Sequence, residues 1–186
     1  GNALAQGTPK RGGTLRISAP ANPSSLDPAT GGAGSDHAFL FTMYDTLTEW
    51  DFETLKPKPG LAESWSFTDP TTLVLNIRSA VAFHDGTPLD AEAVKFNLER
   101  NKSDPKSNIK ADLSSMTSVA VTGPMQVTLK LNAPDAALPG ILSDRAGMMV
   151  SPKAAKEAGD KFGLRPVCAG PYKFVERVQQ DRMVFE

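Results

Sequence analysis

Short segments in which apolar and polar residues alternate restrict this chain to a fold that contains β-strands. Residues 72–78 place three apolar side chains on one face, which is typical of a half-buried strand. Residues 119–131 repeat this alternation on both sides of a Gly-Pro pair, and this arrangement predicts a hairpin. By the same reasoning we predict a strand at 14–18 and a second hairpin at 172–185.

Helical spacing and capping residues predict three helices between the strands. Apolar residues recur three and four positions apart after Ser35, which we expect to cap the first helix. Asp90 is a suitable N-cap for a second helix that runs to about Asn101. Residues 151–159 begin with Ser-Pro and end with Gly, a pattern typical of a third helix. Residues 61–65 are predicted to form a helical turn, so the chain mixes helices with strands.

The composition and charge exclude several classes of function. A formal net charge of -1 leaves no surplus of Lys and Arg for phosphate, so we expect no nucleic-acid partner. No apolar run approaches the roughly 18 residues that suggest a membrane span. The single cysteine, Cys168, excludes an internal disulfide and a zinc site built from several thiolates. We therefore expect a soluble, globular protein that does not itself span a membrane.

The residues alone indicate no catalytic site. His84 precedes Asp85, but Asp-Gly is a turn signal and adjacent strand residues point to opposite faces, so we expect a structural role. Cys168 has no histidine close in sequence, and we expect a buried, unreactive thiol. The sequence contains no Gly-x-Ser-x-Gly elbow and no cluster with metal-ligand spacing. We expect no catalytic residue, no metal site and no cofactor.

A glycine-rich loop at residues 31–34 leaves two interpretations open. Its main-chain N–H groups could hold an anion or a carboxylate, or the loop could simply be flexible. His37 follows the loop at the expected start of a helix, where it either faces a ligand or belongs to the helix terminus.

The N-terminus carries a possible export signal. Residues 3–5, Ala-Leu-Ala, have the small-x-small form of a signal-peptidase site and precede a Gly/Pro/Lys stretch. The alternative is that residues 1–3 derive from cloning. We expect an exported protein with a flexible N-terminus.

A series of short motifs, in one order from about residue 12 to the end, resembles a known family. The resemblance is to the peptide/nickel-binding family (family 5) of extracellular solute-binding proteins of ABC importers. The motifs are Gly-Gly-Thr-Leu at 12–15, Leu-Asp-Pro at 26–28, Tyr-Asp-Thr-Leu at 44–47, Pro-Gly-Leu-Ala-Glu-Ser-Trp at 59–65, Leu-Asn-Ile-Arg at 75–78, Phe-His-Asp-Gly-Thr-Pro-Leu-Asp-Ala-Glu at 83–92, Val-Lys-Phe at 94–96 and Gly-Pro-Tyr-Lys-Phe at 170–174.

This resemblance implies a fold of mixed α/β class, like that of type II periplasmic binding proteins. After a flexible N-terminus at 1–11, residues 12–36 would start the first lobe. Residues 37–155 would form an inserted extra domain, and residues 156–186 would return to the first lobe. Because family members are much longer, the resemblance implies that this chain is only the N-terminal part of a two-lobed protein.

The implied function is that of a solute-binding component of an ABC importer in the periplasm. The protein would capture a peptide or a similar small solute by closure of two lobes and deliver it to a permease in the inner membrane. It would not be an enzyme. By the resemblance, the residues that face the solute are Gly32, Ala33, Gly34, His37, Asn108, Arg145 and Met148.

Three alternatives remain. A sensor or receptor module could use the same fold without an importer, and a Ser-dependent hydrolase is a possibility from another class. Within the family, Met148 and His37 leave binding of haem or of a nickel complex conceivable.

Overall fold

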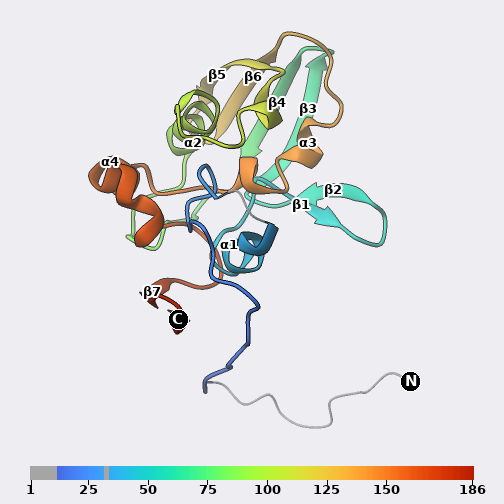
Figure 1. Cartoon of the computed structure of the whole chain (residues 1–186). Helices are drawn as coiled ribbons and strands as arrows, with labels where there is room; N and C mark the ends of the chain where they lie inside the picture. Colours follow the sequence, from blue (N-terminus) through green and yellow to red (C-terminus); the bar gives the residue numbers. More distant parts are fainter. Residues whose placement is uncertain (1–11, 32–33) are drawn as a thin grey trace.

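The largest sheet in the computed structural model, which describes residues 12–31 and 34–186, has four antiparallel strands (Figure 1). The strands lie in the order β3–β4–β6–β5, and helix α2 (Ala91–Ser103) packs on one face of the sheet. The four strands are β3 (Ala62–Asp69), β4 (Thr72–Ile77), β5 (Met116–Gly123) and β6 (Gln126–Leu131).

The alternation in the sequence produces this sheet. The strand predicted at 72–78 is confirmed as β4, in which three side chains are at most 2% exposed: Leu73, Leu75 and Ile77. They pack with Val94 and Leu98 of α2 in a first core cluster. Full burial of each such side chain contributes about 1.5–3 kcal/mol. The hairpin predicted at 119–131 is confirmed as β5–β6.

Two of the three predicted helices are confirmed together with their caps. Helix α2 follows Asp90, whose Oδ1 accepts a hydrogen bond from the Ala93 N–H at 2.9 Å, and it ends at Ser103. Helix α4 (Pro152–Ala158) follows Ser151 and ends at Gly159. The φ angle of Gly159 is 51°, a left-handed conformation that favours glycine at a helix end.

The first predicted helix is shorter than its apolar pattern indicated. A 3₁₀ turn, η1 (Gly34–Asp36), precedes α1 (His37–Met43), and Asp36 rather than Ser35 stands at the N-cap position. The helix ends at Met43 because Tyr44 has extended backbone angles. The apolar residues beyond Met43 are buried outside the helix.

Two predictions of secondary structure are wrong. Residues 61–65 do not form a helical turn: β3 begins at Ala62, and Trp65 lies opposite Leu75 of β4. Pairing with a neighbouring strand thus overrides the local pattern. Residues 14–18 form no strand, and Leu15 and Ile17 are 84% and 81% exposed. Among the described residues no strand lies beside this segment to satisfy its backbone.

The remaining elements surround the sheet and α2. The hairpin β1–β2 projects to one side, and the C-terminal hairpin predicted at 172–185 is confirmed as β7–β8 (Figure 1). These elements are β1 (Thr48–Asp51), β2 (Lys56–Pro59), η2 (Ala111–Leu113), α3 (Leu138–Ile141), η3 (Arg145–Gly147), η4 (Gly159–Leu164), β7 (Phe174–Val178) and β8 (Arg182–Phe185).

A second core cluster connects Leu26, helix α1 and the chain from residue 148 onward. Its buried residues are Leu26, Leu40, Met43, Tyr44, Met148, Val150, Ala155, Phe162, Cys168 and Phe174. Within the part of the chain that the structure describes, no helix is long and apolar enough to cross a membrane.

Candidate functional site

The loop from residue 23 to residue 36, here called the N-terminal loop, is closed at its base. Asp36 is fully buried, and its carboxylate accepts hydrogen bonds from the backbone N–H of Ser24 at 2.8 Å and from its hydroxyl at 2.5 Å. Within the loop, the carbonyl of Asp27 accepts from the N–H groups of Thr30 and Gly31. These contacts join the two ends of the loop and fold its middle back on itself.

Side chains from other parts of the chain bind the carbonyls of this loop. The amide Nδ2 of Asn108 donates to the Thr30 carbonyl at 2.8 Å, and its backbone N–H donates to the Ala29 carbonyl, also at 2.8 Å. The guanidinium of Arg145 donates to the Gly31 carbonyl. The carbonyls of residues 29–31 are therefore all occupied by donors from outside the loop.

A buried ion pair attaches the loop to α2. Both guanidinium Nη atoms of Arg100 contact the carboxylate of Asp27, at 2.5 and 3.0 Å, and the two side chains are 14% and 5% exposed. Burial alone would lower the pKa of Arg100, but the hydrogen bonds and charge of Asp27 outweigh it and raise that pKa. The guanidinium also lies over the ring of Phe162, 5.7 Å from its centroid.

His37 lies beside the loop and is held at both ring nitrogens. Its Nε2 is 3.0 Å from a carboxylate oxygen of Asp144, and its Nδ1 is 3.2 Å from the Gly34 carbonyl. The ring stacks with Phe41 at a centroid distance of 6.0 Å. The histidine thus links the start of α1 to the loop and to the residue before η3.

The structure brings four of the seven residues named from the resemblance to one place. His37, Asn108 and Arg145 surround the N-terminal loop, and Gly34 is exposed, with open space where a Cβ would stand. Met148 is only 1% exposed and packs in the second core cluster. Gly32 and Ala33 lie outside the described residues. Among the described side chains, the Nε of Arg145 is buried without a hydrogen-bond partner.

The structure pairs Cys168 with a histidine that lies far away in the sequence. The Sγ of Cys168 is 3.7 Å from His84 Nδ1 and donates to the Met43 carbonyl at 3.2 Å. The Nε2 of His84 lies 3.0 Å from the Gly170 carbonyl. Burial, with a smaller contribution from the carboxylate of Asp45, raises the pKa of the Cys168 thiol far above its ordinary value. A thiol with a raised pKa is a poor nucleophile. The contact between Cys168 and His84 is therefore interpreted as an ordinary buried contact.

We expect Cys168 to react with a chromogenic disulfide reagent at least about a hundredfold more slowly in the native chain than in concentrated guanidinium chloride. The side chain is fully buried, so reaction requires the structure to open. Stopped-flow absorbance would measure both rates, with Cys168→Ser as the blank. A native rate close to the denatured rate would instead reveal an accessible thiolate.

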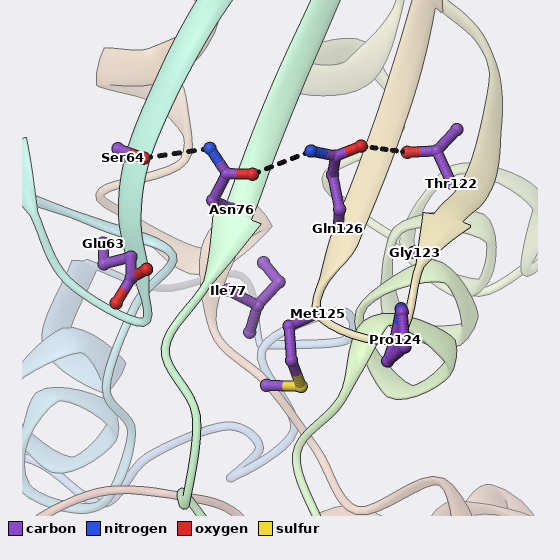
Figure 2. Close-up of a pocket in the computed structure, with 9 residues that line it drawn as sticks. All are labelled: Glu63, Ser64, Asn76, Ile77, Thr122, Gly123, Pro124, Met125 and Gln126. Carbon is purple, nitrogen blue, oxygen red and sulfur yellow. Dashed lines mark hydrogen bonds between the residues drawn. The ribbon is translucent and has the colours of Figure 1, made fainter.

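The hollow shown in Figure 2 lies on the four-stranded sheet and holds a row of polar side chains. It encloses about 400 Å³. A hydrogen-bonded row crosses all four strands, from Thr122 through Gln126 and Asn76 to Ser64 (Figure 2). Because these groups satisfy one another, the row stabilises the sheet. A second groove, of about 480 Å³, lies between α2 and α4.

Among the described residues, no three His, Cys, Asp or Glu side chains are grouped to hold a metal ion. None of the seven solute-facing residues named from the resemblance lines either hollow. The sequence also did not predict the pair Asp27–Arg100, whose members lie far apart in the chain. Asp27 is part of the Leu-Asp-Pro motif at 26–28, but no local sequence pattern indicated that it contacts α2.

Solved structures with this arrangement are binding proteins of the periplasmic type II class. The chain aligns with NikZ from Campylobacter jejuni, solved in complex with Ni(L-His), with a TM-score of 0.78 and 30% identity. That match covers 90% of this chain and 34% of NikZ. NikA from Brucella suis, in complex with Fe(III)-EDTA, aligns with a TM-score of 0.79 and 27% identity, over 91% of this chain and 34% of that one. The predicted mixed α/β class is therefore confirmed.

The chain belongs to the bacterial extracellular solute-binding proteins, family 5, whose model matches residues 56–186. Among curated relatives, the glutathione-binding protein GsiB of Escherichia coli K12 is 34% identical over 155 residues. This match covers 82% of the present chain and 30% of GsiB. The chain thus spans about a third of the length of the relatives that it matches, and those relatives are named as binding proteins.

Proposed function

We propose that this chain supplies one wall of the solute site of an ABC importer's binding protein. The observation that carries the proposal is that donors from three other segments bind Asp27, Thr30 and Gly31 of the N-terminal loop, which also contains the exposed Gly34. A wall that keeps its shape before the solute arrives loses less conformational entropy on binding. Gly32, Ala33 and Gly34 of this loop, with His37 beside them, would face the solute.

We propose that the chain divides as the family resemblance implies. Residues 12–36 and 156–186 belong to the first lobe and residues 37–155 form an inserted domain. The second core cluster supports close packing of these parts, since it contains residues from each of them. A second lobe, supplied by a further part of the protein as in its longer relatives, closes over the solute.

The solute is a peptide or a similar small molecule, and the complex delivers it to a permease in the inner membrane. GsiB is named as a glutathione-binding protein, and glutathione is a short peptide. The protein works in the periplasm after export, and residues 3–5 precede the mature start. We propose that it acts as a binding protein and not as an enzyme, because its curated relatives are named as binding proteins.

We expect the 186-residue chain alone to show no saturable binding tighter than about 1 mM for glutathione, dipeptides or nickel with histidine. Micromolar capture requires about 8 kcal/mol, and a single wall leaves most of the solute in water. Isothermal titration calorimetry of this chain and of the complete product of its gene would measure the difference. The complete product should bind one of these solutes at micromolar concentration.

Two outcomes would contradict the proposal. Micromolar affinity in the 186-residue chain would show that its site is self-contained. Failure of the complete product to bind or import any small solute, in a strain that depends on the encoded importer, would remove the transport function altogether.

A further inference from the structure

Between residues 26 and 31 of the N-terminal loop, five main-chain carbonyls accept hydrogen bonds, those of residues 26, 27, 29, 30 and 31. The Leu26 carbonyl accepts from the Tyr44 hydroxyl at 2.9 Å, and the Asp27 carbonyl accepts from N–H groups inside the loop. The carbonyls of residues 29–31 accept from Asn108 and Arg145. Residues 26–29 and 31 are buried, so their main-chain groups cannot turn to water and need partners within the chain. These partners fix the path of the main chain.

The donors come from separate elements of the fold. Asn108 precedes η2, Arg145 begins η3, and Tyr44 follows α1. Each donates to a carbonyl, so the bonds depend on the path of the loop and not on its side chains. Arg145 and Asn108 therefore already have a partner before any solute arrives.

We propose that Arg145 and Asn108 are positioning residues, which shape the N-terminal loop through the carbonyls of Gly31 and Thr30 and so act on the solute indirectly. This inference rests on the proposed function only for its last step, because the loop contacts exist in the chain alone. It separates these two residues from Gly34, an exposed residue of the loop with open space where a Cβ would stand.

The charge of Arg145 gives its contact with the loop more weight than a neutral bond. A hydrogen bond from a charged donor is about twice as strong as a neutral one. Its Nε is buried, so this part of the guanidinium is not open to solvent. Loss of this side chain should therefore raise local opening of the loop. The sheet and α2 should remain protected, because their core cluster contains no residue of the loop.

Hydrogen exchange with mass spectrometry on the 186-residue chain tests the proposal without any solute. Arg145→Ala and Asn108→Ala should each raise amide exchange in peptides covering residues 24–31 by about tenfold or more. Exchange in β4 and β6 should stay within about twofold of the original chain. Arg145→Lys keeps one charged donor and should restore most of the protection, and exposed Arg165→Ala is the matched control.

The outcomes of this experiment distinguish a positioning role from a structural or a direct solute-binding role. Unchanged exchange at 24–31 in both alanine variants would overturn the proposal, as would a uniform rise across the sheet, which indicates general destabilisation. If the local rise occurs but the complete gene product binds no solute, the positioning role stands and the transport function fails. If solute binds and only carboxylate-bearing solutes lose affinity in Arg145→Ala, Arg145 contacts the solute directly and the indirect role is wrong.

Discussion

Replacing Arg100 by methionine is expected to lower the free energy of unfolding by about 3–5 kcal/mol. Methionine retains much of the buried stem but leaves the carboxylate of Asp27, 5% exposed, without its two charged hydrogen bonds. The cost of an unpaired buried charge is the source of the large effect. Urea denaturation followed by tryptophan fluorescence would give the change.

The double variant Arg100→Met with Asp27→Asn identifies the cause. A neutral asparagine can still accept from the Ala29 N–H, as Asp27 does at 3.0 Å, and it removes the unpaired charge. We expect the double variant to be more stable than Arg100→Met by about 1 kcal/mol or more. The exposed pair Lys106–Asp160 provides the control, since Lys106→Met should change stability by less than about 1 kcal/mol. Equal losses in both lysine and arginine variants would mean that burial of the pair is unimportant.

The second large effect is expected at Gly147. A Cβ at this position would overlap the backbone carbonyl of Leu142, which cannot swing aside as a side chain can. Both residues also accept hydrogen bonds that fix their segment, since the Gly147 carbonyl accepts from Leu47 at 2.9 Å and the Leu142 carbonyl accepts from Thr48 at 3.2 Å. Gly147→Ala should therefore cost at least about 3 kcal/mol or prevent folding.

Thermal unfolding by circular dichroism would measure this loss, and soluble yield would report failure to fold. Gly34→Ala is the matched control because open space surrounds its Cβ position, and its stability should change by less than about 0.5 kcal/mol. A Gly147→Ala variant as stable as this control would show that the turn before η3 can shift freely.

Local patterns predicted the elements that carry their own signals. β4 has period-two burial, and α2 and α4 have side-chain caps, so each could be placed from its own residues. β3 was missed because its identity depends on pairing with β4: Trp65 and Phe67 alternate with serines too weakly to stand alone. The segment 14–18 has the alternation but no neighbouring strand among the described residues.

The sequence predicted the contacts of the candidate site less well than it predicted the fold. The resemblance supplied Asn108 and Arg145, but their bonds to loop carbonyls depend on tertiary placement across 78 and 114 positions. The same holds for Arg100, which meets Asp27 across 73 positions. A further contact of α2 could not be predicted from its apolar pattern. Asn97 is fully buried and exchanges hydrogen bonds with the backbone of Val150 at 2.8 and 2.9 Å.

The occupied carbonyls of the N-terminal loop have a consequence for how such a protein diversifies. Arg145 and Asn108 bind carbonyl groups, which every amino acid possesses, so a substitution at the partly exposed Thr30 keeps the carbonyl that Asn108 binds. Under the proposed function, an exchange of side chains at such positions would change which solute fits while the main-chain path of the loop is retained.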